Sequence, residues 1–416
     1  MSIEIPERTA PPGMPDDVSP LGGRAPARPL VVALGLMGVL LIIGAFAESD
    51  AKQFAHSYLF GYVFALDISL GALFWVLIHH VSGAGWSVGL RRVYENITRA
   101  LPALAVLFVP ILICIYTGNL HEWQSFISQP EPGDPHVQHQ WHIKHLYFSA
   151  PFFLVRITVY FVVWLSYSHF MRRLSERQDS EGGAELALRM RWWAPSGTLL
   201  LGLTTTFFAF DVLMSLQYSW FSTIYGVYFW VGGIRGSMAL AVLIVLAMRF
   251  NGLLQHTITM EHLHDVAKLM FGFTVFWAYI AFSQYFLIWY GNMPEETQFY
   301  LLRRNGSWYD ASILLPILNF GVPFFLLLPR ANKRNPIALA IAAAWILTMH
   351  AFDLYWHVMP VLHRDTIRLH WLDAVAPMFM LCVVLLAVLR GLQRAPLIPI
   401  RDVYLNETIG YVNETP

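Results

Sequence analysis

Apolar residues gather in ten long runs that polar segments separate along the chain. Each run approaches the roughly 20 residues that an α-helix needs to cross a ~30 Å hydrocarbon core. A helix is required, because the core of a bilayer offers no water to pair with an open strand edge. We predict membrane helices at 30–47, 57–80, 100–117, 147–170, 195–216, 224–248, 267–290, 310–329, 337–359 and 371–390.

The composition agrees with an integral membrane protein. Of the 416 residues, 56% are apolar and 13% are charged, whereas soluble domains have about 25% charged residues. Lys and Arg balance Asp and Glu at 27 each, so charge predicts no nucleic-acid partner. The two cysteines, Cys114 and Cys382, lie in apolar runs. With only two cysteines, the chain has no disulfide framework, no Cys-x-x-Cys-His haem attachment motif and too few thiolates to hold an iron–sulfur cluster by itself.

The positive-inside rule orients the predicted helices. Most of the 27 Lys and Arg residues fall in the two tails and the even-numbered loops, which places both termini in the cytoplasm. We expect residues 1–29 to form a disordered tail and residues 391–416 to form a cytoplasmic C-terminal tail. The opposite side has Lys52, Lys144, Arg303, Arg304, Arg364 and Arg368.

Two groups of four helices have related sequences. Phe60-Gly61-Tyr62 precedes Gly71 by the same interval that separates Tyr225-Gly226-Val227 from Gly236, and Ala209-Phe210-Asp211 matches Ala351-Phe352-Asp353. Because each unit has an even number of helices, both would share one orientation. We therefore predict an all-α integral membrane protein with two parallel-repeat bundles, helices two to five (57–216) and six to nine (224–359). The helices at 30–47 and 371–390 would be peripheral.

Ionisable side chains inside the predicted helices are the candidate functional residues. Each such residue costs roughly 2.5–3.5 kcal/mol to insert, and a carboxylate or a histidine can carry a proton. The functional interpretation is a proton path or a quinone environment. The alternative is a set of Asp–Arg pairs that neutralise each other and fix the helices in register. The candidates are Asp67, Arg156, Asp211, Arg235, His350 and Asp353.

Metal and haem sites are not indicated. An outer segment contains His136, His139, His142 and His145, but this spacing alone does not place a ligand set around one ion. A surface that faces solvent or a partner is the favoured interpretation. Only His350 lies deep in a predicted helix, so a haem between two facing histidines is not expected. We expect no catalytic residue, no metal and no covalently bound cofactor in this chain.

Several segments have a more specific sequence. The longest is Phe282–Thr297 (FSQYFLIWYGNMPEET), and the others are His56–Gly61, Pro151–Arg156, Phe210–Leu216, Trp220–Phe229 and Phe352–Trp356. Together, over helices two to ten, they resemble the ActF family of membrane subunits of bacterial alternative complex III, a quinol:electron-acceptor oxidoreductase. This family belongs with the polysulfide-reductase-type integral membrane subunits.

The resemblance implies a non-redox-active subunit of a respiratory complex in the bacterial cytoplasmic (inner) membrane. Its partners would be a homologous quinol-binding membrane subunit, an outer-face iron–sulfur subunit, c-type haem subunits and membrane lipids. Quinone, as menaquinone or ubiquinone, is the non-covalent ligand that it suggests. Two other functions stay open at this point: a stand-alone proton-coupled secondary transporter, and a purely structural scaffold subunit.

Overall fold

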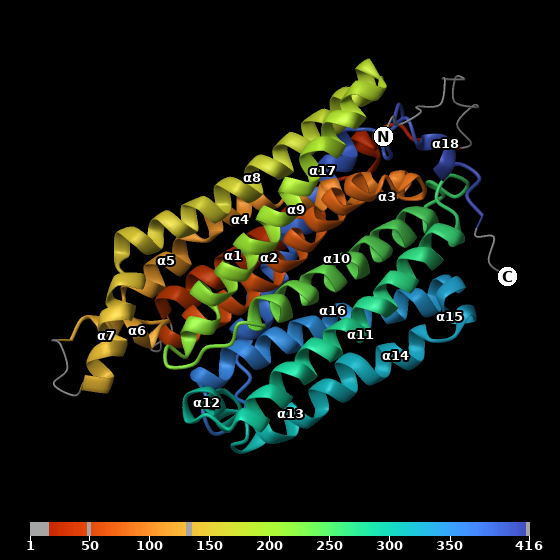
Figure 1. Cartoon of the computed structure of the whole chain (residues 1–416). Helices are drawn as coiled ribbons and strands as arrows, with labels where there is room; N and C mark the ends of the chain where they lie inside the picture. Colours follow the sequence, from red (N-terminus) through yellow and green to blue (C-terminus); the bar gives the residue numbers. More distant parts are fainter. Residues whose placement is uncertain (1–15, 48–50, 130–134, 413–416) are drawn as a thin grey trace.

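Ten helical spans are long and apolar enough to cross a membrane, which confirms the predicted number and the all-α class. The computed structural model describes residues 16–47, 51–129 and 135–412, and no β-strand occurs among them. Residues 1–15 of the predicted disordered tail and residues 413–416 of the C-terminal tail lie outside the described residues. The spans run nearly parallel through one elongated bundle (Figure 1).

Eight spans are single helices and two are composite. The single helices are α1 (Arg28–Ala47), α2 (Ala51–Ser82), α8 (Ala150–Glu181), α9 (Ala184–Val212), α10 (Tyr225–Phe250), α11 (Met260–Gly291), α16 (Pro336–Val358) and α17 (Trp371–Arg394). The first composite span joins α3 (Val88–Thr98), α4 (Leu101–Leu107) and α5 (Val109–Tyr116). The second joins α13 (Ser307–Pro316), a π-helix (Ile317–Gly321) and α14 (Val322–Leu327). Short helices connect the spans: α6 (Glu122–Ile127), α7 (Pro135–Tyr147), α12 (Pro294–Leu302), α15 (Arg330–Arg334) and α18 (Leu405–Thr408).

Helices α2 and α10 form the centre of the molecule. The most apolar window of α2 is 94% buried and that of α10 is 83% buried, against 11% for α1. The two helices approach closely because Gly71 faces Gly233: a Cβ atom at Gly71 would lie 2.2 Å from the carbonyl oxygen of Gly233. Small residues allow such backbone contact in membranes, where packing rather than the hydrophobic effect joins helices. The first helices of the two predicted repeats thus pack on each other, while the repeat itself stays a prediction.

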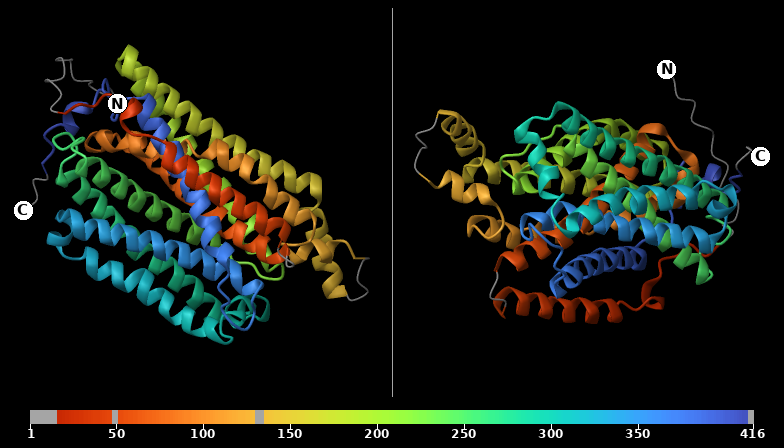
Figure 2. Two further views of the ribbon diagram at one scale, coloured as in Figure 1. Left: turned by 180° about the vertical axis from the view of Figure 1, so that it is seen from behind. Right: turned by 90° about the horizontal axis from the view of Figure 1, so that it is seen from below.

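Helix α17 covers α2, and α1 lies outside α17. Figure 2 shows these two helices as a separate layer beside the remaining spans. A Cβ atom at Gly61 of α2 would lie 2.5 Å from the backbone of Ala376 and Pro377 in α17, so the predicted peripheral helix at 371–390 has a close backbone contact with the centre.

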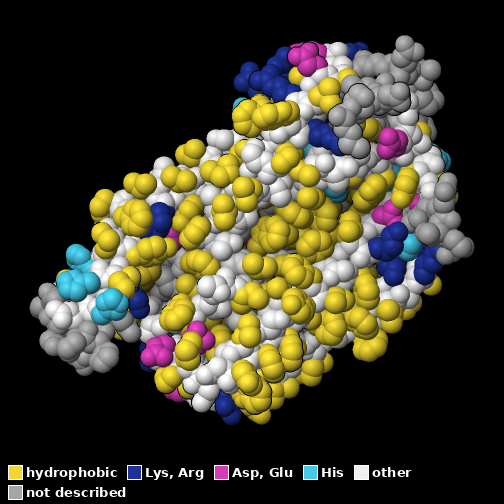
Figure 3. Space-filling model, viewed as in Figure 1, with side chains coloured by type: hydrophobic (Ala, Val, Ile, Leu, Met, Phe, Trp, Pro, Cys, Tyr) yellow, Lys and Arg dark blue, Asp and Glu magenta, His cyan; other side chains and the backbone are white. Residues whose placement is uncertain are grey.

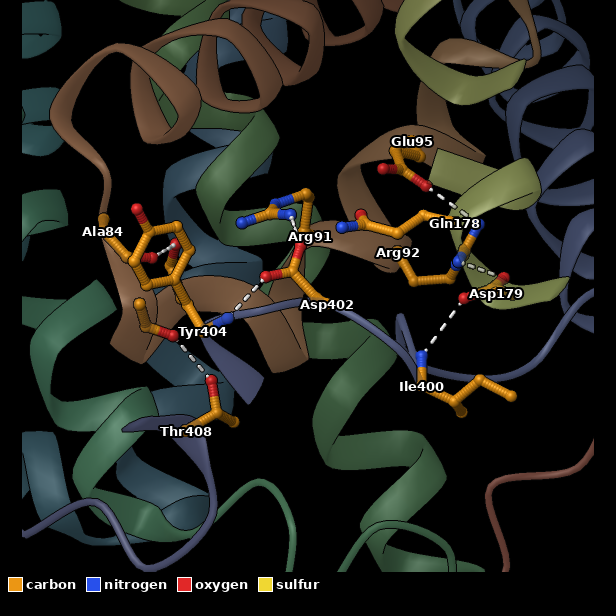
Figure 4. A network of polar contacts seen from close by, with 12 residues as sticks. Ala84, Arg91, Arg92, Glu95, Gln178, Asp179, Ile400, Asp402, Tyr404 and Thr408 are labelled. Carbon is orange, nitrogen blue, oxygen red and sulfur yellow. Dashed lines mark hydrogen bonds and ion pairs between the residues drawn. The ribbon is translucent and has the colours of Figure 1, made fainter. Parts of the chain in front are cut away.

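The third span begins earlier than the sequence pattern indicated. It starts at Gly85 rather than near residue 100, and Arg91 and Arg92, assigned to a loop by the pattern, are buried in α3. Burial is possible because acidic groups reach them. An oxygen of Asp402 lies 2.5 Å from Arg91, and Asp179 and Glu95 pair with Arg92 at 2.6 and 3.1 Å (Figure 4).

Both terminal segments cross the same end of the bundle, which we call the terminal face. The backbone of Leu21 donates to the carbonyl of Leu392, and that of Leu397 donates to the carbonyl of Val18. Residues 395–412 continue over the start of the third span, where Thr408 donates to the carbonyl of Gly85, just before α3, at 2.7 Å. The opposite end, the far face, includes α6, α7 and α12 (Figure 1).

Candidate functional site

The six predicted residues fall into two separate clusters. Arg156 and Asp211 lie together between α8 and α9. Asp67, Arg235, His350 and Asp353 lie among α2, α10 and α16, and each is at most 2% exposed. The clusters differ in how their charges are compensated. This difference distinguishes a structural Asp–Arg pair from a proton path or quinone environment, the two interpretations drawn from the sequence.

The first cluster is a complete ion pair. Arg156 donates from Nε and Nη2 to the two oxygens of Asp211 at 2.9 and 3.1 Å, and Tyr160 donates to Oδ2 at 2.8 Å. The remaining Nη1 of Arg156 donates to the carbonyl of Tyr147 at 2.7 Å, with the guanidinium 3.9 Å from the Tyr147 ring centre. A bidentate pair with further hydrogen bonds compensates the buried charge of Asp211 and the partly buried charge of Arg156. This geometry favours a structural role that joins α8 to α9.

In the second cluster, Asp67 and His350 face each other without a full hydrogen-bond set. Nε2 of His350 lies 3.4 Å from Oδ2 of Asp67, and neither side chain has a hydrogen bond of good geometry among the described residues. Glycines on α10 make room for them. A Cβ atom at Gly232 would lie 2.9 Å from the His350 ring, and one at Gly233 would lie 2.2 Å from Oδ1 of Asp67.

Asp353 is held by neutral donors rather than by an arginine. Tyr228 donates to Oδ1 at 2.5 Å, and the indole of Trp277 donates to Oδ2 at 3.0 Å. One turn further along α16, Nε2 of His357 lies 3.7 Å from Oδ1. Arg235 of the same cluster attracts this carboxylate electrostatically without forming an ion pair with it. Because the direct donors are neutral, a proton could neutralise Asp353 without breaking an ion pair.

The buried arginine of this cluster binds the π-helix. Arg235 donates to the backbone carbonyl of Asn319 at 3.0 Å and to its side-chain oxygen at 2.5 Å. The guanidinium also lies 5.4 Å from the centre of the Trp277 ring. A π-helix widens one turn and often occurs at functional sites; here it presents Asn319 to Arg235.

A lateral pocket of about 930 Å³ reaches the donors of Asp353. Tyr228 and Trp277 form part of its wall, and Phe282 and Trp289 of α11, both more than 60% exposed, lie at its open side. Its other lining residues come from α11, α12 and the loop after it, α13, the π-helix and α16. Mostly apolar pockets of this size with a few polar groups are typical of small-molecule sites.

Polar groups continue from Asp353 toward the far face. Arg303 is buried and donates to the carbonyls of Trp356 and His357 at 3.1 and 2.8 Å, and to Gln217 at 3.2 Å. Burial lowers the pKa of Arg303 to about 9. Gln217 lines a hollow of about 670 Å³ on the far face, beside the exposed Glu122–Arg364 ion pair.

Sequence reasoning found the ionisable residues of this cluster but missed their partners. Tyr228, Trp277 and Asn319 are ordinary residues for a membrane helix, and nothing in their spacing indicates a shared carboxylate or arginine. One signal was available: Gly232, Gly233 and Gly236 cluster on one helix, which is typical of a close helix contact. His357 follows Asp353 by four residues and therefore shares its helix face.

The described residues contain no group of three or more His, Cys, Asp or Glu side chains that could hold a metal ion. The side chain of His136 lies outside the described residues. Neither a family model nor a curated protein sequence matches the chain.

Proposed function

We propose that the chain is the ActF-type membrane subunit of a quinol:electron-acceptor oxidoreductase complex, and that Asp353 carries a proton in it. The observation that carries this proposal is that two residues of the lateral pocket donate hydrogen bonds to the carboxylate of Asp353. Tyr228 and Trp277 line the lateral pocket and also donate to Asp353. A ligand bound in the pocket would therefore contact the groups that control this carboxylate.

The pocket fits the ring of a membrane quinone. Aromatic side chains favour stacking on a flat ring, and entry from the lipid suits a molecule with an isoprenoid tail. Oxidation of the hydroquinone releases protons as well as electrons. In the proposed complex the electrons pass to iron–sulfur and c-type haem subunits, while Asp353, His357 and the polar groups around Arg303 offer a route for protons toward the far face.

Membrane orientation follows from the distribution of charge. Basic residues of the tails and even-numbered loops lie at the terminal face: Arg173 near the end of α8, Arg334 in α15 and Arg394 in the last turn of α17 (Figure 1). By the positive-inside rule the terminal face is cytoplasmic, and protons that leave at the far face would be released outside. The compartment is the bacterial cytoplasmic membrane.

Asp353→Asn tests the proton role. The amide keeps the size of the side chain but cannot exchange a proton, so we expect a lower ratio of protons translocated to electrons transferred. The assay uses the purified complex in proteoliposomes, with quinol oxidation followed optically and proton movement followed with a pH dye. Asp310→Asn is the matched control, because this carboxylate is exposed in the first turn of α13 and is not part of the cluster. An unchanged ratio in Asp353→Asn would contradict the proposed role.

Membership of a complex is tested separately by blue-native electrophoresis with a haem stain. A subunit of the proposed complex co-migrates with haem-containing partners.

The composite spans favour one second candidate, a proton-coupled transporter, because such folds use interrupted helices to build their sites. That function predicts a monomer or homo-oligomer without haem stain.

A further inference from the structure

The lipid-facing seam between α8 and α9 ends in an aromatic cluster near the terminal face. Tyr167 and Ser196 hydrogen-bond across the seam at 2.9 Å. One turn nearer the terminal face, the rings of Phe170 and Trp193 lie 6.1 Å apart, and the guanidinium of Arg189 lies 5.9 Å from the Phe170 ring. Residues from both helices thus meet at one level.

Apolar side chains lead along the lipid-facing surface to this cluster. On α8 the exposed Val155, Val159 and Val162 follow helical spacing, and on α9 Leu199 and Leu203 are exposed. Such stripes contact acyl chains in a bilayer. At the end of these stripes nearest the terminal face, Trp192 and Trp193 are 74% and 45% exposed. Such exposure is typical of tryptophans at the headgroup level.

Two arginines beside the cluster lack a carboxylate partner. Arg172 and Arg177 have one, since they lie 3.9 and 3.0 Å from Glu176 and Glu181. Arg173 and Arg189 are exposed, and within the described part of the chain neither forms an ion pair. Arg173 follows Phe170 by three residues and so shares its helix face. Figure 3 shows basic side chains gathered at this end of the molecule.

We propose that this end of the seam binds an anionic phospholipid of the terminal-side leaflet. The acyl chains would lie on the apolar stripes, the indole of Trp193 at the glycerol level, and the phosphate between Arg173 and Arg189. Guanidinium groups bind phosphate through paired N–H donors. A net negative headgroup is required, because both arginines bring charge that no described side chain neutralises.

Native mass spectrometry of the full chain, with any subunits that purify with it, tests this site. The detergent-solubilised protein is titrated with phosphatidylglycerol or with phosphatidylcholine of the same acyl chains. We expect preferential binding of phosphatidylglycerol to the wild type, and about tenfold to thirtyfold weaker binding to Arg173→Gln/Arg189→Gln, from two basic contacts near the headgroup. The charge-retaining variant Arg173→Lys/Arg189→Lys should keep most of this affinity.

Arg394→Gln is the matched control, because Arg394 is an exposed arginine in the last turn of α17 at the same face. An equal loss in Arg394→Gln would overturn the proposal, since it would indicate general charge attraction. Equal affinity for the two lipids would also overturn it. Displacement of phosphatidylglycerol by inorganic phosphate alone at equimolar concentration would show a free-phosphate site and refute the lipid assignment. Circular dichroism of each variant excludes loss of fold as the cause.

Discussion

Close contact between α2 and α10 makes Gly71→Ala a sharp test of the packing. An alanine Cβ would lie 2.2 Å from the carbonyl oxygen of Gly233 and 2.4 Å from its carbonyl carbon. Non-bonded carbon atoms prefer about 3.5–4.0 Å, so the two helices must move apart by about 1 Å or more. The atoms in the way belong to backbone, which cannot rotate aside as a side chain can.

The magnitude follows from overpacking and helix propensity. Inserting a methyl group into a filled interior typically costs about 1–3 kcal/mol, while alanine is favoured over glycine in a helix by about 1 kcal/mol. Gly202→Ala isolates the second effect, because beyond the neighbouring backbone of α9 itself no heavy atom lies within 4 Å of a Cβ at that position. We therefore expect Gly71→Ala to be less stable than Gly202→Ala by about 1–3 kcal/mol.

Equilibrium unfolding in mixed micelles, followed by circular dichroism, measures this difference. Gly71→Ala should unfold at a lower denaturing-detergent fraction than the wild type, and Gly202→Ala at the same or a higher fraction. If both variants unfolded at the same midpoint, α2 and α10 would not be in backbone contact, and the reasoning would be refuted.

Two other predictions concern the buried ion pair and a half-buried lysine. Arg156→Met leaves the fully buried Asp211 without its counter-charge and should cost about 3–5 kcal/mol. Asp211→Leu should cost less, because Arg156 is partly exposed. The Arg156→Met/Asp211→Leu double variant should lose less than the sum of the single variants, and additive losses in the unfolding assay would show that the pair is not coupled. Burial lowers the pKa of Lys144 from 10.5 to about 8. Between pH 8 and 10.5 the unfolded chain therefore binds more protons than the folded chain. The free energy of unfolding should rise with pH across that window. Lys144→Met should remove this rise, and a pH dependence equal to that of the wild type would contradict the assignment.

Sequence equivalence did not imply equivalent chemistry at Asp211 and Asp353. Both follow an Ala-Phe pair near the end of a predicted helix, and both are buried. Asp211 has an arginine within reach on α8, whereas Asp353 has Tyr228 and Trp277. The partners come from other helices at sequence separations of 51 to 125 residues, so no local pattern could assign them.

Arg91 shows a second limit of the local pattern. Its charge led to a loop assignment, yet it is buried beside Asp402, which lies 311 residues further along the chain. A hydropathy pattern treats each charge as unpaired and cannot anticipate neutralisation by a remote segment. The same limit applies to residues 16–27, whose Pro-rich composition gave no sign of the hydrogen bonds to α17 and the segment after it.

The sequence alone determined that the chain forms ten helices long and apolar enough to cross a membrane, because a hydrocarbon core requires about 20 apolar residues per crossing and internal pairing of every backbone group. It also identified the ionisable residues, since each is costly inside such a helix. Only the tertiary structure decided that Asp211 forms an ion pair with an arginine while Asp353 accepts hydrogen bonds from the neutral donors Tyr228 and Trp277. That choice depends on contacts between helices remote in sequence, and on glycines such as Gly71 and Gly233 that let two backbones touch.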